Sequence, residues 1–192
     1  MKPSPVLALP LALLFAAPLS AQEDQRRYTI DPAASAVEAK VAFLAVASKT
    51  ARFPDMKGAL RFSVGNYEAV DMTVEVDART LAGGGASDTR MLRGKQFFDA
   101  AHYPTVRFVA ERMELTGARS AKVTGRMTAR GVTQPVTLAI VFSLDPMQTD
   151  GTEPLSIVGT TTIDRRRFGM TAFPLVVGNQ VRITIRARMV PG

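Results

Sequence analysis

Repeated alternation of apolar and polar residues is the feature that most constrains the fold of this chain. The clearest run is 70–77, where Val70, Met72, Val74 and Val76 alternate with acidic or hydroxyl residues. A period of two places alternate side chains on opposite faces of a β-strand, so each such strand has one apolar face. Similar runs occupy 37–43, 60–64, 106–115, 121–130, 136–144, 155–163 and 181–189. The chain is therefore predicted to be all-β.

About eight antiparallel strands with one apolar face each must bury those faces in a barrel or a sandwich. A barrel also removes the two exposed edges, and eight strands leave an interior that side chains can fill or that can hold one small ligand. Small residues at inward positions would leave space: Ala39, Ala121, Gly125, Ala129, Gly159 and Ala187. We expect an extended eight-stranded antiparallel barrel. Its interior is either an apolar ligand cavity or is filled by the chain's own loops.

The segment 90–108, RMLRGKQFFDAAHYPTVRF, departs from this strand pattern. Its first half has helical spacing, with Ser87 or Asp88 as the expected cap. This predicts one short helix between the third and fourth long strands. We expect the helix to carry Phe97 and Phe98 and to plug the barrel, with one ring in the interior and the other packed beside it.

Residues 1–21 have the organisation of a secretory signal peptide. Lys2 precedes an apolar run over 6–19 that is too short, and too often interrupted by proline, to span a membrane. We expect cleavage before Gln22, with a cut after Ala17 as the alternative. No linker or shift in composition divides the remainder, so 22–192 is predicted to be one domain.

Composition excludes several classes of function. The chain has no cysteine, which excludes disulfides, cysteine-ligated metal, thiol catalysis and lipid attachment, and its single histidine excludes a histidine cluster. The net charge of +7 is compatible with nucleic acid, anionic lipid or solubility alone. We expect no nucleic-acid partner, because the outward strand faces carry almost no aromatic residues for base stacking. A weak contact with an anionic membrane surface and a homodimer both stay open.

Two clusters invite a chemical role. Asp99 and His102 could act as an acid–base pair, but we expect them to fix the turn that follows the helix. The basic run 165–167 could bind a pyrophosphate head group or anionic lipid. The alternative is a solvated loop in which Arg165 pairs with Asp164 or another acid. We predict no catalytic residue, no metal site and no cofactor.

The segment 90–108 resembles the hallmark of the YceI-like family, the lipid- or polyisoprenoid-binding family. Further segments resemble that family in the same order: 28–32, 123–128 with 130–138, 163–165 with 168–170, and 181–185. The resemblance implies an extended lipocalin-like barrel with an elongated apolar pocket. It implies a bound isoprenoid chain, such as a quinone tail or a polyprenyl pyrophosphate, and secretion to the periplasm. It brings no catalytic residues.

The chain departs from the family pattern in three places. Phe43, Leu44 and Ala45 stand where the family often has His and Gly, the stretch 51–55 replaces a Gly-rich path, and Arg188 replaces an acidic residue. The first departure puts a polar contact to the ligand's head group in question.

The sequence thus predicts a periplasmic binding or carrier protein that holds an isoprenoid or polyprenyl lipid in its barrel. Two alternatives remain: a ligand-free barrel with a structural or stress-response role, and a secreted hydrolase or isomerase that acts on a lipid-like substrate through His102 and Asp99. The predicted pocket is lined by Phe43, Phe62, Val74, Leu92, Phe97, Phe98, Phe108, Met127, Ile140, Phe142, Ile157, Phe168, Met170 and Ile183.

Overall fold

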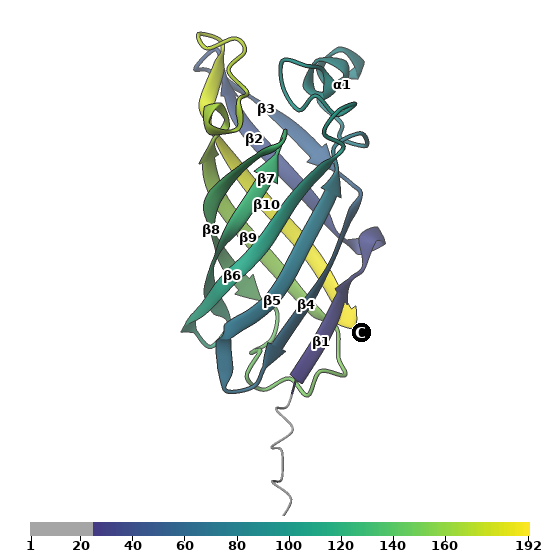
Figure 1. Ribbon diagram of the computed structural model, residues 1–192, viewed down its shortest axis with the longest axis vertical. Coiled ribbons are helices and arrows are strands. Elements are labelled where there is room, and N and C mark those ends of the chain that lie inside the picture. Colours follow the sequence, from purple (N-terminus) through teal and green to yellow (C-terminus); the bar gives the residue numbers. More distant parts are fainter. Residues whose placement is uncertain (1–24) are drawn as a thin grey trace, which may run out of the picture.

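The computed structural model describes residues 25–192; the predicted signal peptide and its cleavage site lie outside them. This part of the chain is mostly β-sheet (Figure 1). Its strands are β1 (Gln25–Ile30), β2 (Ala36–Phe43), β3 (Ala47–Phe53), β4 (Met56–Ser63), β5 (Asn66–Asp77), β6 (Thr105–Gly117), β7 (Ser120–Ala129), β8 (Val132–Phe142), β9 (Leu155–Asp164) and β10 (Val177–Pro191). Its helices are the 3-10 helices η1 (Pro32–Ala34) and η2 (Arg165–Phe168) and the α-helix α1 (Ala86–Arg93). None of these helices is long and apolar enough to cross a membrane.

Eight of the strands form a closed antiparallel ring. β1 is followed around the ring by β4 to β10, and β10 returns to β1 through pairs such as Tyr28 with Pro191. β2 and β3 form a hairpin that pairs with the other part of the same β10 edge. The ring is elongated along its strands (Figure 1). The prediction of an extended eight-stranded lipocalin-like barrel is therefore confirmed.

β2 and β3 form a hairpin in a region where the sequence pattern predicted only the first of these strands. Phe43 pairs with Ala47, and the turn between them holds Leu44 at φ 50° and Ala45 at φ 60°. Glycine, asparagine and aspartate adopt this left-handed conformation most readily, so the turn carries none of the residues that usually mark one. The sequence pattern therefore did not identify β3, although Ala51 and Phe53 alternate with Arg52 in this strand.

Helix α1 lies between β5 and β6, as predicted, but its bounds differ from those expected. Its N-cap is Gly85, rather than Ser87 or Asp88, and it ends at Arg93. Phe97 therefore belongs to the turns that follow the helix. No residue of α1 is fully buried, so the helix covers the barrel's rim rather than plugging its interior (Figure 1).

The two ends of the barrel differ. At the lower end in Figure 1, the loop 143–154 packs against the end of the ring. The hydroxyl groups of Tyr28 and Thr149, both buried, lie 3.0 Å apart in a hydrogen bond that ties this loop to β1. At the upper end, the segment 78–104 and the loop 169–176 surround the rim.

Candidate functional site: an apolar pocket in the upper half of the barrel

An apolar cavity occupies the upper half of the barrel and opens at its rim. Its volume is about 160 Å³. Its wall is formed by inward residues of β2, β3, β5, β6, β7, β9 and β10, together with α1 and η2. A cavity of about 150 Å³ holds one benzene molecule, so the free space suits about five or six carbon atoms, or about one five-carbon isoprene unit.

The structure brings ten of the fourteen predicted residues together around this cavity. They are Phe43, Val74, Leu92, Phe97, Phe98, Phe108, Met127, Phe168, Met170 and Ile183. The other four do not border it: Phe62, Ile140, Phe142 and Ile157. These four are buried in the packed lower half. The predicted lining is therefore wrong for these four residues, which pack the barrel below the cavity.

Large neighbours fill the space beside several small residues. A Cβ on Gly125 would lie 2.7 Å from Cζ of Phe108, and one on Gly159 would lie 2.9 Å from Cδ1 of Ile140. Both distances are too short for ordinary packing, so these glycines accommodate neighbouring side chains and leave no void. Of the small inward residues, Ala39 and Ala129 do line the cavity.

Aromatic rings cover the cavity below the rim. Phe97 is buried and stacks on Phe173, with ring centroids 6.2 Å apart and planes at 21°. Phe98 meets Phe53 edge to face at 5.4 Å. Phe97 and Phe98 both lie in turns after α1, so the helix does not carry them as predicted. Both line the cavity.

Arg165 is the one cationic side chain that is both buried and part of the described cavity wall, with 3% of its surface exposed. Its guanidinium donates from Nε to Gly178 O at 2.9 Å, from Nη2 to Val177 O at 2.8 Å and from Nη1 to Met170 O at 2.5 Å. Burial lowers the pKa of Arg165 from its ordinary value. Its hydrogen bonds hold the loop before β10 against the top of the barrel.

Asp164 pairs with Arg166, not with Arg165 as one expectation had it. Nη2 of Arg166 donates to Oδ2 of Asp164 at 2.6 Å, and the backbone N–H of Arg166 donates to Oδ1 at 2.9 Å. These hydrogen bonds from Arg166 lower the pKa of Asp164 from 3.8 to about 2. The basic run 165–167 is therefore not uniformly solvated: its first residue is structural and the other two are exposed.

The sequence pattern missed the part of the wall that β3 supplies. Thr50, Ala51 and Phe53 line the cavity from this strand. The alternation of Ala51 and Phe53 with an exposed arginine was the available signal. Near the rim, Nζ of Lys49 lies 2.8 Å from Oδ2 of Asp88 in α1, which joins the hairpin to the helix.

The candidate acid–base pair lies away from the cavity wall. Nδ1 of His102 donates to Oδ1 of Asp99 at 2.9 Å, and the imidazole is exposed. The backbone N–H of His102 also donates to Asp99 O at 3.0 Å, so the pair stabilises the turn after α1. Within residues 25–192, no three acidic or histidine side chains are grouped to hold a metal ion.

Comparison with known proteins identifies the family. The YceI-like domain matches residues 28–189. The chain belongs to the YceI-like family. A UPF0312 protein of Pseudomonas savastanoi pv. phaseolicola is 30% identical over 166 residues, which cover 85% of this chain and 84% of that protein.

Solved structures share the YceI-like fold. BcnA of Burkholderia cenocepacia superposes with a TM-score of 0.73 at 21% identity, covering 83% of this chain and 98% of BcnA. A polyisoprenoid binding domain from Saccharophagus degradans, implicated in plant cell wall breakdown, gives a TM-score of 0.66 at 11% identity. That match covers 86% of this chain and 98% of the domain.

Three of the segments that carry the YceI-like resemblance, 90–108, 130–138 and 163–170, meet near the mouth of the pocket. Arg130, in the turn between β7 and β8, donates from Nη2 to Lys95 O at 2.7 Å and from Nη1 to Gly169 O. In the same region, Gln134 and Arg167 exchange two hydrogen bonds of 3.0 and 3.1 Å. Three segments distant in sequence are thus fixed to one another at the rim.

Proposed function

We propose that the mature protein is a periplasmic binding or carrier protein that holds the isoprenoid chain of an amphiphilic lipid inside its barrel. The observation that carries this proposal is the apolar cavity, which is packed below and opens at one end of the barrel. Membership of the YceI-like family supports it, as does the fold shared with a polyisoprenoid binding domain. The signal peptide predicted at 1–21 supports secretion.

The cavity wall suits a branched hydrocarbon chain. Burial of each methylene contributes about 0.8 kcal/mol before the costs of ordering and association. Met91, Met127 and Met170 line the space, and flexible thioether side chains adapt to irregular apolar shapes. Because the free space suits only about one isoprene unit, a longer chain must extend through the mouth or displace the covering loops.

Mass spectrometry of an organic extract from gently purified protein tests the proposal. We expect a co-purifying isoprenoid lipid and saturable uptake of a quinone probe with a short isoprenoid tail, measured in detergent solution. An extract without lipid, together with no saturable uptake, would instead favour the ligand-free structural barrel.

A matched pair of variants locates the ligand. Ala129→Leu adds bulk to the cavity wall, whereas Ala139→Leu makes the same change at an exposed position of β8. The first should weaken probe binding by about tenfold or more, since filling the space displaces at least two methylene-sized groups. The second should leave binding unchanged. Equal affinities for both variants would place the ligand elsewhere.

A further inference from the structure

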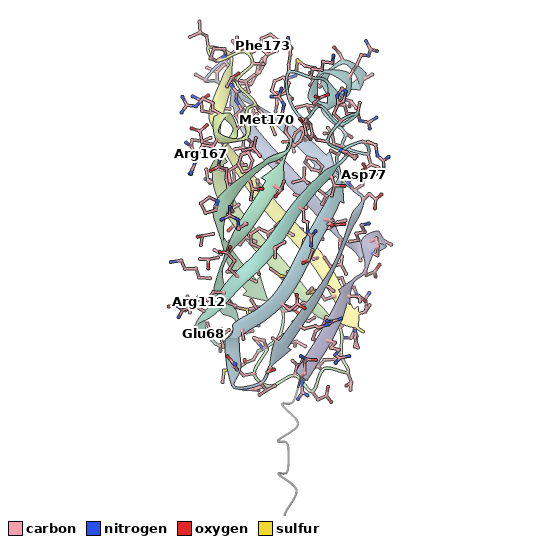
Figure 2. All side chains as sticks on the ribbon, viewed as in Figure 1. Glu68, Asp77, Arg112, Arg167, Met170 and Phe173 are labelled. Carbon is pink, nitrogen blue, oxygen red and sulfur yellow. The ribbon has the colours of Figure 1, made fainter. Side chains whose placement is uncertain are left out.

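Two loop tips at the upper end of the barrel present large apolar side chains to solvent. The turn between β2 and β3 exposes 55% of Leu44 and 92% of Val46, and the loop before β10 exposes 43% of Phe173 and 95% of Leu175. Figure 2 places Phe173 at the upper extreme of the molecule, above Met170. We call Leu44, Val46, Phe173 and Leu175 the rim patch.

The rim patch is one surface that borders the pocket. The backbone N–H of Leu44 donates to Val176 O at 2.8 Å, which joins the two tips. Phe173 stacks on Phe97, and Phe97 lines the cavity. The most exposed apolar side chains of this end therefore lie next to the opening through which a lipid would pass.

The backbone of these tips is strained. Leu44, Ala45 and Phe173, with φ of 50°, 60° and 51°, are three of the five described non-glycine residues with positive φ. A left-handed conformation is costly for such side chains, and exposure of their apolar surface adds a hydration cost. Neither feature contributes to folding stability, which points to contact with an apolar medium outside the protein.

Cations outnumber acids around the rim patch. The segments 47–49, 78–104, 130–131 and 164–176, which form this end, carry nine basic residues: Lys49, Arg79, Arg90, Arg93, Lys95, Arg130, Arg165, Arg166 and Arg167. They carry three acids: Asp88, Asp99 and Asp164. Two of these acids are already paired with Lys49 and Arg166. Apolar tips surrounded by positive charge match the interface of a bilayer that contains anionic lipid.

We propose that the rim patch inserts into the surface of an anionic phospholipid bilayer and directs the pocket mouth toward it. The inference rests on the proposed function for its purpose: a lipid chain could move between bilayer and barrel without crossing water. A bilayer fits better than a protein partner, because the apolar side chains stand at exposed loop tips beside an excess of positive charge. The acyl region accepts such tips individually, while the cations remain at the head groups.

Vesicle flotation tests this docking. The wild-type protein should float with vesicles of phosphatidylethanolamine and phosphatidylglycerol and bind phosphatidylcholine vesicles more weakly. The double substitution Val46→Ser and Leu175→Ser should reduce the partition coefficient by about tenfold or more, since two exposed apolar side chains are removed. The control, Val141→Ser with Val158→Ser, changes exposed apolar residues on the barrel wall and should bind as the wild type does.

Fluorescence provides an independent readout. The chain has no tryptophan, so Leu175→Trp introduces a single indole at the rim patch. Its emission should shift to shorter wavelength when anionic vesicles are added. Val141→Trp should show no shift. Equal shifts for both variants, or none for either, would overturn the docking orientation.

Probe uptake in detergent solution separates this inference from the proposed function. The serine double variant should take up the quinone probe as the wild type does, because neither Val46 nor Leu175 lines the cavity. Normal uptake without vesicle binding by the wild type would overturn membrane docking and leave the proposed function intact. Vesicle binding without uptake would contradict the proposed function alone. Concentration-dependent dimers that the serine substitutions abolish, with no vesicle binding, would assign the rim patch to a second copy and overturn the inference.

Discussion

Phe97 and Phe173 stack across the mouth of the barrel, with ring centroids 6.2 Å apart and planes at 21°. Phe97 follows α1, whereas Phe173 lies in the loop before β10. One contact therefore joins two segments that surround the opening. Because Phe97 lines the cavity, a ligand that leaves by this route must disturb the stacked pair.

Phe173→Ala should accelerate release of the bound probe by about three- to tenfold, because an aromatic pair contributes about 0.5–1.5 kcal/mol. The free energy of unfolding should fall by no more than about 1.5 kcal/mol, since the aromatic pair is the contact that is lost and Phe173 is 43% exposed. Stopped-flow displacement measures the release rate. Leu144→Ala, which removes an exposed apolar side chain in the loop 143–154 at the lower end, is the control. Equal release rates for the two variants would contradict a covering role for Phe173.

Phe142→Ala should reduce the free energy of unfolding by about 3–5 kcal/mol, because the residue is buried in the packed half of the barrel. Probe affinity of the folded variant should stay unchanged, since Phe142 does not border the cavity. Urea unfolding measures the stability change. Val141→Ala, on the outward face of the same strand, should change stability by less than about 0.5 kcal/mol. A large loss of affinity in folded Phe142→Ala would show that the ligand reaches the lower half.

Arg165→Met should reduce the free energy of unfolding by about 3 kcal/mol or more, because it leaves three carbonyl groups without their donor. Arg165→Lys should be intermediate, since an ammonium cannot reproduce the planar set of donors. Urea unfolding gives the totals, and hydrogen exchange over 169–178 localises the effect. Arg167→Met replaces an exposed neighbour in the same run and should cost less than about 1 kcal/mol. Similar losses for Arg165→Met and Arg167→Met would contradict a structural role specific to Arg165.

Asp164→Asn should lower the melting temperature at pH 6, because it removes the charge that pairs with Arg166 and keeps an oxygen for the N-cap. The pKa of Asp164 is about 2 in the folded protein and 3.8 ordinarily. A lowered folded pKa contributes stability above pH 3.8 that is lost as the pH falls through about 2. The melting temperatures of the two proteins should therefore converge between these values. A difference that stays constant down to pH 2 would contradict the ion pair's contribution.

The sequence determined the strands and their inward faces, because the two-residue period of a strand is local. Val70 and Met72 are buried and Asp71 is exposed, as their alternation predicts. The same reasoning missed β3, because the turn at Leu44 and Ala45 carries no glycine or asparagine. The prediction that the helix carries Phe97 was also wrong. Helix α1 ends at Arg93, Gly94 is its C-cap, and Phe97 lies in the turn that follows.

Only the tertiary structure decided which half of the barrel is open. Whether a small inward residue leaves a void depends on side chains from neighbouring strands: Phe108 occupies the space beside Gly125, whereas Ala129 faces the cavity. The burial of Arg165 likewise depends on carbonyl groups that the loop before β10 brings to it. Alternation is a property of consecutive residues and can be read along the chain. The cavity volume and the hydrogen bonds from Arg165 to carbonyl groups depend on residues that meet only when the ring closes.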